Sequence, residues 1–148
     1  MRIYLDNCSY NRPYDDQSQM RISLETQAKL YIQRLVKEKK IELVTSYVLD
    51  YENSDNPYEM RRNTIAEFIT VQTSAYVDVS HHKELSSKVT EIMSTGIKYK
   101  DACHVACAMY AGCEFFISTD ARLLKYQSKE IMMLNPIDFL EKLEAESL

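Results

Sequence analysis

The amino-acid sequence predicts an α/β fold: a single domain with a mostly parallel central sheet of about five strands and helices on both faces. Three observations support this prediction. Short β-prone runs alternate with longer segments of helical periodicity, which is typical of a parallel sheet covered by helices. The chain has 148 residues, the length of one domain. Its composition, 45% hydrophobic and 27% charged, is ordinary for a globular protein.

The first third of the chain contains two predicted strands, residues 2–5 and 41–44. Residues 18–37 between them predict a helix, because apolar residues recur at helical spacing and form one face. The residues of that face are Leu24, Ala28, Tyr31 and Leu35. After the second strand, Thr45 or Ser46 can cap a helix, which we expect to end near residue 54.

The middle of the chain predicts a third strand, with one helix before it and one helix after it. Asn56 can be the N-cap of the first helix, and Glu59, three residues later, completes a capping box. Residues 76–79 form the predicted strand. Ser80 can cap the second helix, which we expect to run to about residue 95.

The last third of the chain predicts two strands and three helices. A helix from about residue 99 should stop at Gly112, because glycine is common just past a helix C-terminus. The apolar residues 115–117 predict a strand, and a short helix follows Asp120. Residues 131–134 predict the last strand, and Asn135 opens the final helix.

Composition excludes several classes of function. The only glycines are Gly96 and Gly112, so the chain has neither a Walker loop nor a dinucleotide-binding fingerprint, which need clustered glycines. The formal net charge of −4 argues weakly against a nucleic-acid binder, which usually carries a basic excess. No window approaches the roughly 20 apolar residues of a membrane helix, and no signal peptide is recognisable. We therefore expect a cytoplasmic protein without membrane contact.

The four cysteines are Cys8, Cys103, Cys107 and Cys113. Because no export signal is present, we expect reduced thiols rather than disulfides. Cys103 and Cys107 lie four residues apart on a predicted helix, but no second cysteine or histidine pair stands at zinc-site spacing. The sequence therefore favours small buried thiols over structural zinc.

Four acids occupy positions that converge in the predicted fold. Asp6 directly follows the first strand, and Asp120 directly follows the strand at residues 115–117. Glu52 lies two turns into the helix after the second strand, and Asp101 lies in the first turn of the helix that precedes residues 115–117. Ligands of parallel α/β sheets bind beyond the carboxyl ends of the strands, where these acids are expected.

A cluster of four carboxylates would repel itself at low dielectric unless cations neutralised it. Mg²⁺ and Mn²⁺ prefer such oxygen ligands. Two such ions, about 3.5–4 Å apart, can activate a water and stabilise the leaving oxygen of a phosphodiester. The acids therefore predict a metal-dependent phosphodiesterase site.

Each acid also has an ordinary structural interpretation. Asp101 in a first helical turn complements the helix dipole, and Asp120 can cap its short helix. Asp6 after a strand can form a turn. Glu52 can belong to a solvated face together with Asp50, which is also its rival as the site residue. The hypothesis depends on the four acids acting together.

Four segments carry a family resemblance: residues 3–7, 44–52, 100–108 and 115–120. They are similar, in this order, to four motifs of the PIN-domain nucleases. The first two motifs are the first strand with its acid, and a strand followed by an acid on a helix. The last two are the Asp-Ala-x-His-x-Ala-x-Ala helix, and the final strand with its Thr-Asp step. The sequence resembles this family over nearly its whole length. The Asp-Ala-x-His helix is the most specific match.

The resemblance implies a single PIN-like domain over residues 1–148. It implies a ribonuclease that depends on Mg²⁺ or Mn²⁺ and hydrolyses RNA phosphodiester bonds. Asp6, Glu52, Asp101 and Asp120 would be both its catalytic and its metal-binding residues. Such proteins are often the toxin of a toxin–antitoxin pair, so a small antitoxin protein and a homodimer are the expected assemblies. One departure is that residues 121–124 supply no further acid.

Several polar residues flank these motifs. Arg12, Lys98 and Thr119 are candidate RNA-binding residues, because cations and hydroxyls can hold phosphates. Solvated surface charge is an equally good interpretation, as it is for other cations nearby: Lys100, Arg122 and Lys125. His104, three residues after Asp101, is interpreted as a helix-packing histidine.

Two other functions remain open at this level. A catalytically decayed module would bind RNA or a protein partner without cleavage, but such decay predicts lost acids, and all four are present. A haloacid-type phosphatase needs two aspartates flanking one residue after the first strand. Here that place holds Asp6-Asn7-Cys8, which makes this the weakest alternative.

Overall fold

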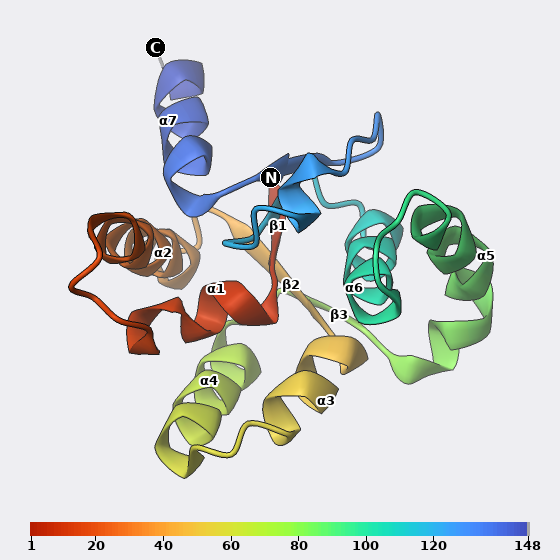
Figure 1. Ribbon diagram of the computed structural model, residues 1–148, viewed down its shortest axis with the longest axis horizontal. Coiled ribbons are helices and arrows are strands. Elements are labelled where there is room, and N and C mark those ends of the chain that lie inside the picture. The colour runs from red at the N-terminus through yellow and green to blue at the C-terminus, as the bar shows by residue number, and fades with distance from the viewer. Residues whose placement is uncertain (148) are drawn as a thin grey trace.

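A five-stranded parallel sheet forms the centre of the computed structural model, which describes residues 1–147 (Figure 1). The strand order is β3-β2-β1-β4-β5. The strands are β1 Arg2–Leu5, β2 Glu42–Ser46, β3 Ala75–Val77, β4 Phe115–Ile117 and β5 Met132–Leu134. The predicted fold class is confirmed, and each predicted strand is present within two residues of its expected bounds.

Helices cover both faces of the sheet (Figure 1). The α-helices are α1 Asn7–Asn11, α2 Met20–Lys37, α3 Tyr47–Ser54, α4 Glu59–Gln72, α5 His82–Met93, α6 Tyr99–Tyr110 and α7 Pro136–Ser147, and three 3-10 turns are η1 Arg12–Tyr14, η2 Val79–His81 and η3 Leu123–Lys125. Tyr4, Val44 and Phe116 face the core shared with α5 and α6. Their strand neighbours, such as Ile3 and Leu43, face α2, α4 and α7, because side chains alternate along a strand.

The chain reverses its direction of winding at β1. It passes from β1 to β2 and β3 on one side, and then crosses to β4 and β5 on the other side. Tyr4 pairs with Val44 of β2 and with Phe116 of β4, so β1 is the central strand. The point between β1 and β4 is a topological switch point, where open α/β sheets bind ligands at the carboxyl ends of their strands.

Several local predictions are confirmed. The Ser46 hydroxyl accepts from the backbone N–H of Leu49 and caps α3. Gly112, with φ of 74°, follows the end of α6, a conformation that glycine adopts without strain. The Asn135 side-chain oxygen accepts from the backbone N–H of Asp138 at the start of α7.

The predicted apolar face of α2 is partly wrong. Ala28 and Leu35 are buried, but Leu24 is 47% exposed and Tyr31 is 50% exposed. The inward face instead includes Glu25, which is fully buried. The guanidinium of Arg12 in η1 pairs with this carboxylate. Because this ion pair lies on the inward side of α2, the buried face differs from the one that the apolar pattern predicted.

Two predicted helix caps are also wrong. The Asn56 side-chain oxygen accepts from the backbone N–H of Tyr58, two residues later, so it forms a turn and α4 begins at Glu59. Ser80 lies inside η2, whose cap is Asp78, and α5 begins only at His82. In both places the side chain favours a local turn over the helix.

The cysteines and the helices agree with two further expectations. None of the four cysteines, which all lie in the described part of the chain, forms a disulfide. Cys103, Cys107 and Cys113 are buried, whereas Cys8 lies at the surface. No helix within residues 1–147 is long and apolar enough to cross a membrane.

Candidate active site

Asp6 lies at the carboxyl end of β1 and is the N-cap of α1. Its Oδ1 accepts hydrogen bonds from the backbone N–H and the hydroxyl of Ser9, both at 3.0 Å. Its Oδ2 accepts from the Ser118 hydroxyl at 2.6 Å. Burial raises the pKa of Asp6, and the hydrogen bonds from Ser118 and Ser9 oppose this shift. The carboxylate is therefore rigidly held although its charge is poorly solvated.

Ser118 joins Asp6 to Asp120 across the switch point. It follows β4 and is fully buried. Its hydroxyl donates to Asp6 and accepts from the backbone N–H of Asp120 at 3.0 Å. Asp120 is half-buried and caps the following turn by accepting from the backbone N–H of Arg122. The two aspartates thus lie at the ends of adjacent strands and share one serine.

Glu52 lies on α3, and two side chains hold it. Its Oε1 contacts Nε2 of His104, a residue of α6 that is 1% exposed. The Asn7 side chain is a second hydrogen-bond partner. Burial raises the pKa of Glu52, but the hydrogen bond and charge of His104, aided by the charge of Lys100 and by Asn7, outweigh it and lower the pKa. Glu52 is therefore kept ionised.

A buried chain of hydrogen bonds supports His104 from behind. The Tyr4 hydroxyl lies 2.5 Å from Nδ1 of His104 and 2.7 Å from the Ser46 hydroxyl. An ionised Glu52 carboxylate only accepts, so Nε2 donates to it. On the other side of the ring, Nδ1 is hydrogen-bonded to Tyr4, which is hydrogen-bonded in turn to Ser46. The β1 and β2 strands thereby orient a carboxylate on α3.

Asp101 faces the other acids from the first turn of α6. This helix leads back to β4, so its N-terminus lies at the same edge as the carboxyl ends of the strands. Burial raises the pKa of Asp101, and the charges of Asp120 and Glu52 add to the effect, while His104 and Lys98 oppose it. The charges of Asp120 and Glu52 therefore reach Asp101.

The side chain of Cys8 lies among all four acids. Partial desolvation, together with the charges of its four acidic neighbours, raises the pKa of the thiol to about 12. Those neighbours are Asp6, Glu52, Asp101 and Asp120. Within residues 1–147, none of the four makes an ion pair with a lysine or an arginine. The four predicted site residues thus lie near Cys8, and in the described part of the chain none of them is paired with a lysine or an arginine.

The chemistry of this donor set fits a divalent cation, because carboxylate oxygens are hard ligands and none of the four is paired with a lysine or an arginine in residues 1–147. The side chains are not drawn tightly together: in the described residues, no group of three or more His, Cys, Asp or Glu has the arrangement of a metal-binding site. A cation would therefore have to draw carboxylates such as Asp101 and Asp120 inward.

Asp50, the rival of Glu52, points elsewhere. Its carboxylate accepts a 2.6 Å hydrogen bond from the Tyr76 hydroxyl of β3. Residues two apart on a helix do not share a face, and here the acid facing His104 is Glu52.

The three residues predicted to bind RNA have different surroundings. Arg12 is engaged by buried Glu25 at 2.9 Å and by Asp15 at 3.0 Å, which leaves its guanidinium little freedom for a phosphate. Lys98 is exposed at the start of α6 and acts on the charge of Asp101. Thr119 lies half-buried between Ser118 and Asp120. Only the last two border the acids.

Sequence reasoning missed the residues that hold the acids in place. His104 was interpreted as a packing residue, yet it contacts Glu52 directly. Its spacing of three from Asp101 places both on one side of α6 and was the available signal. Ser118, Asn7 and Tyr4 gave no signal, because their roles depend on contacts between distant segments.

The fold is similar to that of a solved structure, VapBC2 from Rickettsia felis bound to a DNA fragment from their promoter. The TM-score is 0.56 at 12% sequence identity, and the match covers 91% of this chain and 98% of that chain. No protein-family model matches the sequence, and no curated protein matches it either. At this identity the likeness concerns the fold, and it confirms the expected PIN-like α/β architecture.

Proposed function

We propose that this protein is a divalent-metal-dependent endoribonuclease that hydrolyses RNA phosphodiester bonds. One observation carries the proposal: four carboxylates without a lysine or arginine partner in residues 1–147 meet at the topological switch point of the sheet. Partly buried acids that repel one another oppose folding, and such groups are common at functional sites. The likeness to VapBC2 supports the assignment at the level of fold.

Asp6, Glu52, Asp101 and Asp120 would hold Mg²⁺ or Mn²⁺. A cation bound by them would supply Lewis-acid chemistry for attack by water on the phosphodiester. Ser9 and Ser118 fix Asp6. His104 and Asn7 fix Glu52, as described above. Such outer partners orient metal ligands and tune their basicity.

The two remaining acids lie on the open side of the site. Asp101 and Asp120 are half-buried, whereas Asp6 is 3% exposed. Lys98 and Lys100 act on the charges of Asp101 and Glu52 without forming an ion pair in the described part of the chain. Both lysines can therefore attract a polyanion and place a backbone phosphate over the acids.

A catalytically decayed module is the second candidate. It is disfavoured because the structure keeps not only the acids but also their supports, from Ser118 to the buried chain behind His104. We further propose a small antitoxin protein as partner, since the similar structure is named as the assembly VapBC2, and a homodimer as the assembly, which the family resemblance alone supports.

The test is cleavage of defined single-stranded and hairpin RNAs by the purified chain in Mn²⁺, in Mg²⁺ and in chelator. We expect cleavage with either metal and none in chelator. Asp6→Asn should be inactive in the same assay, and Asp50→Asn serves as the matched control outside the site. Equal cleavage by the parent and by Asp6→Asn would assign the activity to a contaminant and remove the proposal.

A further inference from the structure

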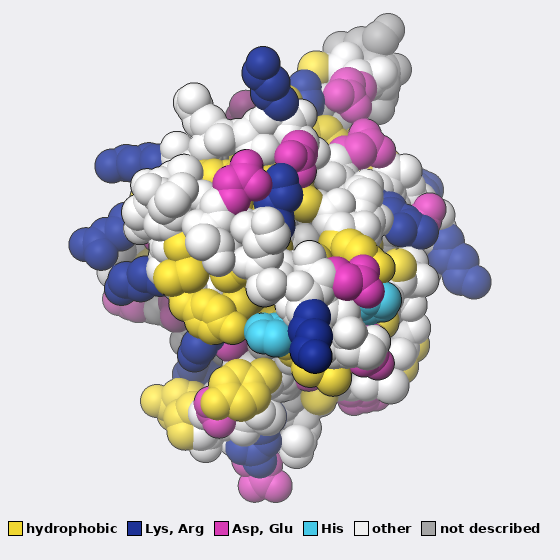
Figure 2. Space-filling view, turned by 90° about the vertical axis from the view of Figure 1, so that its right-hand side faces the viewer, with side chains coloured by type: hydrophobic (Ala, Val, Ile, Leu, Met, Phe, Trp, Pro, Cys, Tyr) yellow, Lys and Arg dark blue, Asp and Glu magenta, His cyan; other side chains and the backbone are white. Residues whose placement is uncertain are grey.

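A pocket of about 470 Å³ lies between α3, η2 and the starts of α5 and α6. Its lining is mainly aromatic and apolar, with one lysine: Tyr47, Val48, Tyr51, Val79, His82, Tyr99, Lys100 and Cys103. On the face of the molecule that α5 presents, hydrophobic side chains gather beside histidine and lysine or arginine (Figure 2).

The pocket has a fixed floor and a fixed wall. Val48 and Cys103 are each 6% exposed and form its base. The Tyr47 hydroxyl lies 2.9 Å from Nδ1 of His82, and the two rings meet edge to face. This hydrogen bond holds two aromatic rings as one rigid wall.

The rim of the pocket is apolar and uncovered. Tyr51 is 62% exposed, Val79 is 61% exposed and Tyr99 is 49% exposed. Exposed apolar side chains that gather around a pocket mark binding surfaces. An occupant with flat apolar faces would bury them.

The pocket and the acidic site use neighbouring residues of α3 and α6. Tyr51 directly precedes Glu52 on α3, and Lys100 directly precedes Asp101 on α6. Lys100 lines the pocket and also lowers the pKa of Glu52 by its charge, after the larger effects of burial and of His104. Two residues that line the pocket are therefore sequence neighbours of two proposed metal-binding residues.

We propose that this pocket binds one unpaired nucleobase of the RNA strand, next to the phosphate that is cleaved. This inference rests on the proposed ribonuclease function and names a subsite for its substrate. Bases of single-stranded RNA stack on aromatic side chains and are followed by phosphates. Tyr51 and Tyr99 offer the stacking surfaces, and Lys100 offers a cation for the adjoining phosphate.

A second copy of this chain fits the pocket less well. In a two-fold interface the same patch lies on both sides, and the pocket lining contains a lysine but no acid to pair with it. A planar, anionic ligand is complementary to the pocket.

The test measures binding of a short single-stranded oligoribonucleotide with one 2-aminopurine, using the full chain in chelator so that no cleavage occurs. Tyr51→Ala and Tyr99→Ala should each weaken binding by about 5- to 150-fold and reduce the quenching of 2-aminopurine. Tyr51→Phe and Tyr99→Phe keep the ring and should bind within about twofold of the parent.

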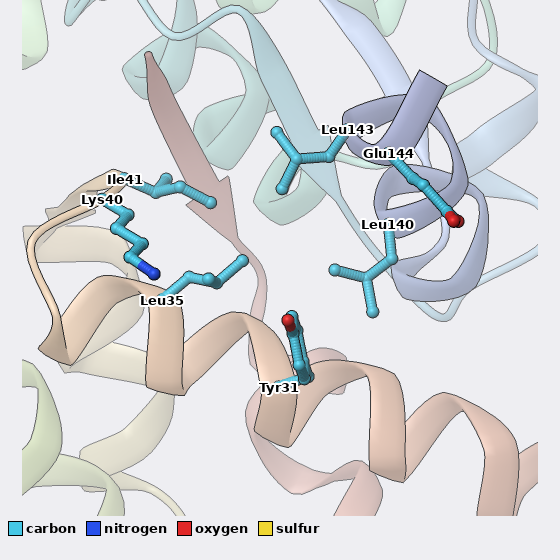
Figure 3. A pocket seen from close by; sticks show the side chains of 7 residues that line it. All are labelled: Tyr31, Leu35, Lys40, Ile41, Leu140, Leu143 and Glu144. Carbon is cyan, nitrogen blue, oxygen red and sulfur yellow. The ribbon is translucent and has the colours of Figure 1, made fainter. Parts of the chain in front are cut away.

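Tyr31→Ala is the matched control. Tyr31 is also half-exposed, but its side chain points into a different pocket, between α2 and α7, with Leu35 and Leu140 (Figure 3). This variant should bind the oligonucleotide as the parent does.

The outcomes distinguish a failure of the proposed base-binding pocket from a failure of the proposed ribonuclease function. If the parent cleaves RNA in Mn²⁺ and the alanine variants bind and cleave like the parent, the subsite is wrong while the ribonuclease stands. Unchanged RNA binding together with a lower solution mass of the alanine variants would assign the pocket to a second copy and overturn the proposal. A parent that neither binds nor cleaves RNA removes both.

Discussion

Nε2 of His104 is hydrogen-bonded to Oε1 of Glu52, and Nδ1 of the same ring is hydrogen-bonded to the Tyr4 hydroxyl. The imidazole is 1% exposed and therefore has no alternative partner in water. Because Tyr4 belongs to the central strand, the position of Glu52 is set by the sheet. The carboxylate is thus oriented before any cation or substrate binds.

The first prediction concerns this contact. His104→Gln should lower the Mn²⁺ affinity by about 10- to 100-fold, the usual loss when an outer partner of a metal ligand is changed. Titration calorimetry with Mn²⁺ measures it. Tyr4→Phe removes only the hydroxyl behind the ring and should have a smaller effect of the same sign. A His104→Gln variant with the affinity of the parent would reduce His104 to a packing residue.

Divalent metal should stabilise the folded chain. Binding to the native state alone adds RT ln(1 + [L]/Kd), about 2.7 kcal/mol at a hundredfold excess over Kd. For a chain of this length that corresponds to a rise in Tm of about 5–10 °C. Thermal melts in chelator, Mg²⁺ and Mn²⁺ measure it, with Ca²⁺ and Na⁺ at equal ionic strength as controls. A Tm that no divalent ion moves would argue against the site.

Substitution of the site acids should separate them from their neighbours. Asp6→Asn, Glu52→Gln and Asp120→Asn should each lower kcat by more than about 100-fold, beyond the loss expected for an outer partner. Asp50→Asn should stay within about threefold of the parent, because Asp50 bonds Tyr76 outside the site. If Asp50→Asn were the severe change and Glu52→Gln the silent one, the second motif would be wrongly assigned.

Asp101→Asn should stabilise the metal-free protein at neutral pH. Burial and the charges of Asp120 and Glu52 raise the pKa of Asp101, so the folded state prefers the protonated acid. Stability is then lost as the pH rises from the ordinary carboxyl pKa through the raised one. A role limited to the helix dipole predicts the opposite sign, a loss of about 0.3–1 kcal/mol.

Urea unfolding of parent and Asp101→Asn in chelator at pH 4 and pH 7 distinguishes these signs. We expect the advantage of the variant to appear at pH 7 and to shrink at pH 4, where more of the Asp101 of the parent is protonated. In Mn²⁺ the order should reverse, since the variant has lost a ligand. A variant that is less stable in chelator and gains as much from Mn²⁺ as the parent would show that Asp101 has only a structural role.

The sequence predicted the positions of the helices and strands better than it predicted which of their side chains are buried. Periodicity located the sheet, and strand-end position placed Asp6 and Asp120 at one edge of it, because the carboxyl ends of parallel strands meet there. The face of α2 could not be found in this way, since Glu25 is buried by a pairing with Arg12, thirteen residues earlier. The contact of His104 with Glu52 spans 52 residues. Both depend on tertiary packing, which periodicity does not encode.

The last prediction concerns Lys29, a buried residue to which no chemistry is assigned. It is 4% exposed, and its amine lies 5.3 Å from the centroid of the Tyr10 ring. Burial, with a further contribution from the charge of Lys37, lowers the pKa of Lys29 from 10.5 to about 7. Within residues 1–147 it forms no ion pair. The folded state therefore prefers the neutral amine, whereas the unfolded chain keeps it charged up to its ordinary pKa.

The sign of the effect follows from proton counts. Between about pH 7 and pH 10.5 the unfolded chain binds more protons at Lys29 than the folded chain, so this residue's contribution to stability rises with pH. Lys29→Met keeps the length of the side chain and removes the charge. Each pKa unit corresponds to about 1.4 kcal/mol, so the variant should be more stable than the parent at pH 7 by up to a few kcal/mol. Urea unfolding of both proteins at pH 7 and pH 9.5 measures the difference, which should shrink at the higher pH. Taking the difference cancels the cysteines and tyrosines that titrate in the same range, and a gap that stays constant or widens with pH would show that Lys29 is charged in the folded protein.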